Sequence, residues 1–227
     1  FLYSITEPGN SIISFSITLD QYIKFFTDKD FLLILWRSLA IAIKTTIICL
    51  LLGYPIAYYI ARTKEKTQNM LILCITIPMW INMLVRTYAW IGLLSDGGLI
   101  QKILSLVGLG HIKLLYTEGA VLLGMVYNFL PFMILPIYNV LAKIDRDVLY
   151  AARDLGANGV QTFIRIILPL SVPGVISGIT MVFVPALTTF VISDLLGGSK
   201  ILLIGNVIEQ EFKQGSNWHT GSGLSLV

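Results

Sequence analysis

The stretch YAARDLGANGVQTFIRIILP, residues 150–169, differs in character from the chain on either side of it. It begins as a short charged segment and breaks at Gly156. A second amphipathic stretch then leads into Pro169 and another long apolar run. This pattern predicts a small helix that faces solvent between two apolar segments. The nature of those segments decides the fold class.

The apolar segments are long and nearly free of charge. Of the 227 residues, 56% are hydrophobic and 13% are charged, whereas about a quarter of the residues of a soluble domain are charged. A helix that crosses a bilayer needs about 20 apolar residues. Four windows reach that length: 31–60, with two charged residues, 70–94, with one, and 120–141 and 166–193, with none. Because no window alternates as barrel strands do, the sequence predicts an all-α, polytopic transmembrane helical bundle.

The two ends of the chain are expected to belong to further spans. Residues 1–5 are similar to the tail of an earlier span, and residues 223–227 are similar to the opening of a later one. We therefore expect a single transmembrane domain over residues 1–227, with the first and last spans truncated.

The distribution of Lys and Arg predicts the orientation. Loops 61–69 and 142–165 hold seven cations in 33 residues, whereas segments 1–30, 95–119 and 194–222 hold six in 84. Loops rich in cations stay in the cytoplasm. The two basic loops fall on the same side, as alternating spans require, so the quoted stretch is expected to face the cytoplasm.

Local signals within loop 142–165 predict two helices. Asp145 or Asp147 can cap the first, and Gly156 can end it in a left-handed conformation. Val160, Phe163, Ile164 and Ile167 then recur at helical spacing and are expected to lie along the membrane face. Loops of this length with secondary structure of their own are usually functional, but these residues alone leave docking and simple connection equally open.

Several function classes find no support in the residues. Cys49 and Cys74 lie inside spans, where packing is their expected role, and the two histidines are in different loops without acidic neighbours. No metal site and no cofactor is predicted. The segment LGGSKI at 196–201 lacks the spacing of a phosphate-binding loop, and no catalytic constellation is present, so the chain is not expected to be an enzyme. A net charge of +3, dispersed along the chain, does not suggest nucleic acid.

The quoted stretch resembles the signature of binding-protein-dependent ABC importer permeases. That signature is Glu-Ala-Ala, three residues, Gly, nine residues and Ile-x-Leu-Pro. Here it reads Tyr150-Ala151-Ala152, Gly156 and 166–169, with every spacer of the same length. In that family the motif forms the coupling helix, which sits in a groove of the ATPase subunit. The resemblance therefore implies ATPase-coupling residues, namely Tyr150, Ala151, Ala152, Asp154, Leu155, Gly156 and Ala157. Tyr150 replaces the motif's glutamate, so the ion pair that this carboxylate can form with the ATPase is not expected here.

Further stretches resemble one branch of the family, the first of the two spermidine/putrescine importer permeases. They include LGYPIAYYIAR at 52–62, FLPFMILPIY at 129–138 and SDLLGGSK at 193–200. The resemblance implies a type I importer permease fold (MetI-like) with about six spans and a place in the bacterial cytoplasmic membrane. The implied partners are a second permease in a heterodimer, two cytoplasmic ATPase subunits and an extracytoplasmic polyamine-binding protein.

Polar residues in or beside the spans are candidates for the translocation pathway, because polar groups in a bilayer tend to face a cavity or a partner. Asn82 and Arg86 are four residues apart and would share a helix face. The full set is Asn82, Arg86, Tyr88, Tyr127, Asn128 and Asp194. Hydrogen bonding that only holds the bundle together is the competing interpretation, and it is favoured for Tyr127 and Asn128. The spans contain no Asp or Glu, so a polyamine substrate is implied by the resemblance and not by the visible chemistry.

Two other functions remain open. One is a related ABC importer for another solute, such as iron or an oxyanion, which Arg86 would suit better. The other is a secondary transporter or channel without an ATPase, against which the spacing of the coupling loop argues.

Overall fold

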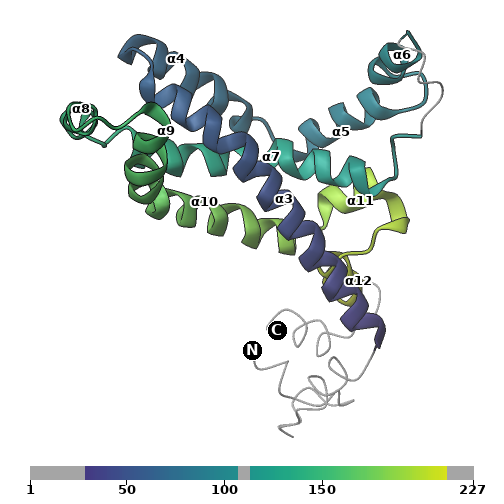
Figure 1. The fold of residues 1–227 in the computed structure, drawn as a ribbon. Helices are drawn as coiled ribbons and strands as arrows, with labels where there is room; N and C mark the ends of the chain where they lie inside the picture. Colours follow the sequence, from purple (N-terminus) through teal and green to yellow (C-terminus); the bar gives the residue numbers. More distant parts are fainter. Residues whose placement is uncertain (1–28, 107–112, 214–227) are drawn as a thin grey trace, which may run out of the picture. The chain divides into compact units, whose positions relative to one another are not determined.

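The structure, a computed structural model, describes residues 29–106 and 113–213, and there the chain is helical with no strand. The expected terminal spans and both histidines lie outside these residues. Figure 1 labels the helices, and the contacts divide the chain into two compact units. Unit 1 combines the described parts of Phe1–Ala42, Thr87–Val121 and Leu187–Val227, and unit 2 combines Ile43–Arg86 and Leu122–Ala186.

Three helical runs are long and apolar enough to cross a membrane, as the windows at 31–60, 120–141 and 166–193 predict. They are α3 (Lys29–Arg62), α7 (Glu118–Leu141) and the run Gly159–Thr188. The third run consists of α9 (Gly159–Thr162), a π-helical turn at Phe163–Ile167 and α10 (Leu168–Thr188). Each exceeds the length that a bilayer core requires.

The window at 70–94 is not one straight helix. Helix α4 (Glu65–Thr76) continues into a 3₁₀ turn at Ile77–Trp80, and α5 (Met83–Leu94) follows. The segments Glu65–Trp80 and Met83–Ser105 are bent by 93°, so a fourth span exists only as this broken pair. The break has a local cause: Ile81 is extended, with ψ 136°, and the Asn82 side chain accepts a hydrogen bond from Leu84 N at 2.8 Å. Asparagine thereby starts a new helix, as it does at helix N-termini generally.

In unit 2, α7 and α10 pack with their backbones in close approach. Gly174 and Gly178 form a Gly-x-x-x-Gly pair on α10, and both are buried. A Cβ on Gly174 would lie 2.9 Å from Pro136 O of α7, and one on Gly178 would lie 2.7 Å from Met133 Sδ. Small residues at such positions let helices approach in a membrane, where packing replaces the hydrophobic effect as the driving force.

In unit 1, one of two short helices packs beside the first part of α3. Helix α11 (Val191–Gly197) leads through a 3₁₀ turn at Gly198–Lys200 to α12 (Ile204–Lys213). Ser38 Oγ of α3 accepts a hydrogen bond from Ile204 N at 2.8 Å. Ile204 and Val207 of α12 are buried against Phe31, Ile34 and Leu35 of α3. The segment LGGSKI thus forms the end of α11 and the turn that follows.

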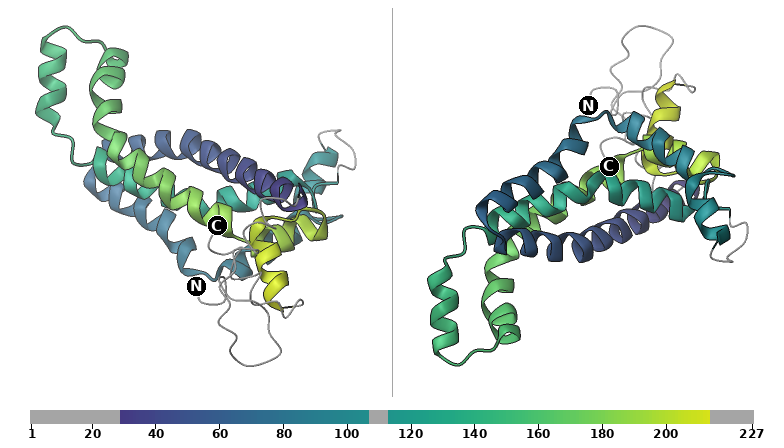
Figure 2. Two further views of the ribbon diagram at one scale, coloured as in Figure 1. Left: turned by 90° about the horizontal axis from the view of Figure 1, so that it is seen from below. Right: turned by 90° about the horizontal axis from the view of Figure 1, so that it is seen from above.

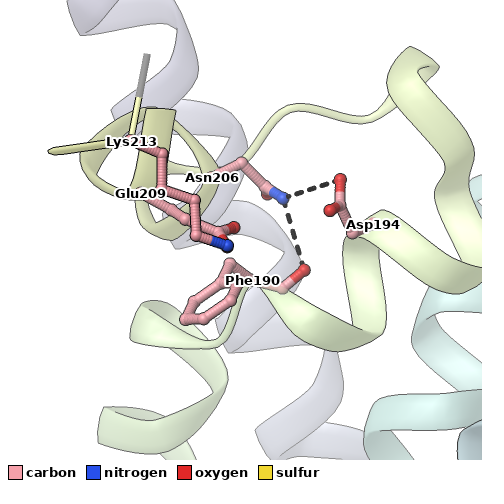
Figure 3. A network of polar contacts seen from close by, with 5 residues as sticks. All are labelled: Phe190, Asp194, Asn206, Glu209 and Lys213. Carbon is pink, nitrogen blue, oxygen red and sulfur yellow. Dashed lines mark hydrogen bonds and ion pairs between the residues drawn. The ribbon is translucent and has the colours of Figure 1, made fainter. Parts of the chain in front are cut away.

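The link between α11 and α12 depends on Asn206, which is 2% exposed. Its Nδ2 donates to Phe190 O and to Asp194 Oδ1, both at 3.3 Å (Figure 3). Its Oδ1 accepts from Ser193 Oγ at 2.7 Å and from Leu203 N at 3.0 Å. Every hydrogen-bonding site of the amide is therefore occupied. Farther along α12, the exposed Lys213 ammonium pairs with Glu209, which raises the pKa of Lys213.

We expect Asn206→Asp to destabilise unit 1. An oxygen would replace Nδ2 and face the Phe190 carbonyl and the Asp194 carboxylate, so two hydrogen bonds are lost and two carboxylates meet. Leaving such buried groups unsatisfied costs about 1–3 kcal/mol each. The melting temperature of the purified protein measures the loss, with Asn69→Asp on the exposed surface of α4 as the matched control.

The destabilisation by Asn206→Asp should shrink as the pH falls. The new carboxyl lies beside Asp194 in a buried place, which raises its pKa in the folded state above the unfolded value. The folded state therefore binds a proton more readily than the unfolded state and gains stability relative to it at low pH. If Asn206→Asp and the control Asn69→Asp melt at the same temperature at neutral pH, the Asn206 amide does not stabilise unit 1 as we expect.

Candidate coupling and pathway sites

The cytoplasmic loop predicted from residues 142–165 contains a well-formed short helix, α8 (Arg146–Asp154). Asp145 is its N-cap, with the carboxylate accepting from Asp147 N at 3.1 Å. The other end closes on Gly156, with φ +83°. Gly156 N donates to Arg153 O at 2.8 Å and Ala157 N to Ala152 O at 3.0 Å. This pair of bonds is a Schellman motif, and it confirms the predicted cap and the predicted left-handed glycine.

The surface of α8 is divided into a packed side and an exposed side. Leu149 and Ala152 are buried, whereas Val148, Tyr150 and Leu155 are exposed, Tyr150 by 55% and Leu155 by 89%. Ala151 and Asp154 are exposed too, and Ala157 is half-buried. The coupling residues implied by the sequence therefore fall on both sides of the helix. Large apolar side chains that are exposed to solvent on a charged loop are typical of a surface that another protein covers.

The segment after α8 is helical and contains a π-helical turn that the sequence pattern does not predict. Asn158 and Gln161 form a reciprocal capping box, and α9 then runs through the π-helical turn directly into α10. Figure 2 shows α8 and α9 side by side as a hairpin at the end of α10. The four residues that recur at helical spacing do not share one environment: Val160 and Ile164 are exposed, Phe163 is half-buried and Ile167 is buried. The π-helical turn shifts the register after Phe163, and a count based on 3.6 residues per turn does not anticipate it.

A chain of aromatic contacts joins this hairpin to α3. Phe163, in the π-helical turn, makes edge-to-face contacts with Tyr58 and Tyr54 of α3, with ring centroids 5.6 and 5.9 Å apart. Tyr54 Oη lies 2.8 Å from Ser171 Oγ of α10, within hydrogen-bonding distance. Tyr58 in turn lies under the Arg62 guanidinium, 5.3 Å from the ring centroid. Edge-to-face pairs contribute about 0.5–1.5 kcal/mol each beyond buried area, so the base of the coupling loop is fixed to α3 at several points.

Two of the six pathway candidates, Arg86 and Tyr127, line one pocket of unit 2. The pocket has a volume of about 190 Å³, and its other walls are apolar: Ile56, Ile75, Pro78, Leu130, Pro131 and Ile134. Arg86 Nε is buried with no hydrogen-bond partner among the described residues. A guanidinium donor without a partner in apolar surroundings is costly, which makes this pocket the candidate region for a ligand or a partner side chain.

The other four candidates are not brought to this pocket. Asn82 caps α5 one turn before Arg86, whose backbone N donates to Asn82 O at 3.2 Å, and Asn82 does not line the pocket. Asn128 is buried and donates to Gly124 O of its own helix at 2.8 Å, while its Oδ1 has no partner among the described residues. Tyr88 and Asp194 belong to unit 1 and are exposed. Sequence reasoning missed the apolar walls of the pocket, since isoleucine and proline carry no signal of function.

Comparisons of the chain with a family model and with curated proteins agree with each other. The family model for the binding-protein-dependent transport system inner membrane component matches residues 50–215. The spermidine/putrescine transport system permease protein PotB of Haemophilus influenzae is 42% identical over 224 residues, which cover 98% of this chain and 78% of that protein.

Two solved structures share the fold. A bacterial ABC transporter involved in the import of the acidic polysaccharide alginate has a TM-score of 0.74 at 17% identity, covering 93% of this chain and 78% of the other. A bacterial alginate ABC transporter in complex with an alginate pentasaccharide-bound periplasmic protein has a TM-score of 0.73 at 19% identity, with coverages of 92% and 77%. The chain is therefore a polytopic membrane protein that belongs to the family of binding-protein-dependent transport system inner membrane components.

Proposed function

We propose that this chain is the membrane-spanning permease subunit of an ATP-driven importer of polyamines, spermidine and putrescine. The observation that carries the proposal is the 42% identity to a spermidine/putrescine permease over nearly the whole chain. The alternatives, an importer of iron or an oxyanion and a secondary transporter, gain no support from this relative.

The proposed assembly contains three kinds of partner. A second permease completes the pathway as a heterodimer, two cytoplasmic ATPase subunits supply ATP hydrolysis, and an extracytoplasmic binding protein delivers the substrate. The family description, which names dependence on a binding protein, supports the last of these. So does the alginate transporter, which was solved with its periplasmic protein.

Residues 142–165 act in this proposal as the cytoplasmic coupling loop of a single permease domain. The exposed Tyr150 and Leu155 enter a groove of the ATPase, Ala151 allows its surface to come close, and Asp154, Gly156 and Ala157 shape the end of α8. Ala152 is buried and anchors the helix. Closure of the ATPase pair then moves α8 as a rigid element, and the contacts of Phe163 with α3 pass the movement to the spans. Rigid-body motion between two arrangements is the usual basis of alternating access.

The pathway in this proposal includes Asn82, Arg86, Tyr88, Tyr127, Asn128 and Asp194. Polyamines are cations, which carboxylates and aromatic faces attract. Asp194 and Tyr88, which are exposed in unit 1, supply one carboxylate and one aromatic face. The positively charged Arg86 does not attract a cation, so its role is to order the pocket around Tyr127. The second permease supplies further acidic groups.

Uptake by the complete complex tests the proposal. The four components are reconstituted in proteoliposomes with ATP on the ATPase side and radiolabelled spermidine on the binding-protein side. We expect uptake that requires ATP and the ATPase and that excess putrescine suppresses. Uptake of an oxyanion or iron in place of spermidine, or uptake that persists without the ATPase, would refute it.

A further inference from the structure

A second pocket of unit 2 lies where the end of α3 meets α8. Its lining consists of Arg62, the last residue of α3, and of Leu149, Tyr150 and Arg153 of α8. Its volume is about 190 Å³. That is well above the roughly 30 Å³ share of one water molecule and below the roughly 300–1,000 Å³ of small-molecule sites. A pocket of this size suits a side chain of another protein.

The pocket carries two positive charges and no negative one. The guanidinium group of arginine is a cation, and neither Arg62 nor Arg153 forms an ion pair with any residue that the structure describes. Leu149 is apolar, and Tyr150, at the position where the signature has glutamate, brings no negative charge. Two guanidinium groups at one pocket repel each other unless an anion lies between them.

The structure holds the Arg62 guanidinium in place, and the position of Arg153 in its helix favours a positive charge. Arg62 rests on the ring of Tyr58, which the edge-to-face contact with Phe163 holds in place. Arg153 is in the last turn of α8, where the negative end of the helix dipole favours a cation. Because the guanidinium fork matches a carboxylate with two parallel hydrogen bonds, two arginines at one pocket favour a carboxylate ligand.

We propose that this pocket, formed by Arg62, Tyr150 and Arg153, receives a carboxylate side chain of the partner ATPase subunit. The inference rests on the proposed coupling role of α8 and names the chemistry of the contact. The exposed Leu155 and Val148 on the same helix give the partner an apolar surface beside the charged pocket. A lipid phosphate is the competing anion. It is disfavoured because the exposed Asp147 and Asp154 of this helix would then face an anionic membrane surface.

Carbodiimide crosslinking tests the contact directly, because it joins an amine only to a carboxylate that touches it. Arg62→Lys and Arg153→Lys keep the positive charge and bring an amine to the pocket. Arg165→Lys is the matched control, an exposed cation of the same loop that does not line the pocket. Each variant is purified as the complete complex in nanodiscs, with and without anionic lipid, and crosslinked peptides are mapped by mass spectrometry.

We expect Arg153→Lys and Arg62→Lys to crosslink to one Asp or Glu of the ATPase and Arg165→Lys not to do so. Arg153→Glu, in the same complex, is expected to lower substrate-stimulated ATP hydrolysis by about tenfold or more, as loss of a hydrogen-bonded charge pair at an interface does. Arg165→Glu should lower it far less.

The outcomes separate this inference from the proposed function. If the ATPase copurifies and hydrolyses ATP but no pocket variant crosslinks to it, the carboxylate site is overturned and the coupling role stands. Hydrolysis that depends on Arg62 and Arg153 only when anionic lipid is present would assign the pocket to a headgroup and likewise overturn the inference. An ATPase that fails to bind the unmodified permease would instead overturn the coupling role itself.

Discussion

Replacement of Gly156 by valine is expected to lower substrate-stimulated ATP hydrolysis by the assembled transporter about tenfold or more while leaving the permease in the membrane. The residue has φ +83°, and nothing lies within 4 Å of the position of an added Cβ. The effect therefore arises from the backbone and not from a clash. A side chain in the left-handed region costs about 1–2 kcal/mol, and a β-branched one costs more.

The strain at residue 156 is expected to break the Schellman motif. The bonds from Gly156 N to Arg153 O and from Ala157 N to Ala152 O would be lost, and Leu155 would turn away from its present direction. Because 1.4 kcal/mol corresponds to a factor of ten in an equilibrium, stimulated hydrolysis should fall about tenfold or more. ATP turnover of the reconstituted complex, with and without loaded binding protein, measures it.

Two variants control for the change at Gly156. Gly159→Val adds the same side chain to a glycine with equally open surroundings and no left-handed backbone, and it should retain coupling. Gly156→Asn should retain most of it, since asparagine tolerates the left-handed region. Loss of hydrolysis in all three variants would show that bulk and not backbone conformation matters here.

Substitution of Gly174 by leucine is expected to cause the largest loss of folded stability. The added Cβ would lie 2.9 Å from Pro136 O, 3.0 Å from Val140 Cγ2 and 3.1 Å from Ile137 Cα. Two of these atoms belong to the backbone of α7 and cannot move without the helix. Overpacking costs about 1–3 kcal/mol and occasionally more, and we expect the upper end of that range, with a clear fall in melting temperature and in the yield of folded protein.

Ser177→Leu is the matched control for Gly174→Leu. Residue 177 lies on the same helix but is exposed, so the same side chain meets no α7 backbone there. Gly174→Ala should give an intermediate melting temperature. If Gly174→Leu and Ser177→Leu melt alike, the close approach of α7 and α10 is not important for stability.

The signals that sequence reasoning used correctly were local. Asp145 and Gly156 set the two ends of α8 through bonds to their own neighbours, and the apolar windows set the three long helices through composition. The window at 70–94 shows the limit of composition. Its apolar content indicates a span, yet Asn82 makes a capping bond that divides the segment, and a pattern that counts apolar residues does not detect it.

The candidate sites depended on contacts between distant parts of the chain. The sequence could place Arg86 and Tyr127 in spans, but the two residues are 41 positions apart in the chain. The apolar residues that line the pocket with them have no distinguishing character in the sequence. Likewise nothing in the sequence linked Arg62 with Arg153, or Phe163 with two tyrosines of α3.

By itself the amino-acid sequence determined the bilayer as the environment, the helical class and the short cytoplasmic helix with its caps. These properties depend on composition, on the helical period and on bonds between residues a few positions apart. Only the tertiary structure decided that Gly174 and Gly178 meet the backbone of α7 and that two arginines face one pocket. Such pairings depend on helix packing, which brings together residues that share no local signal.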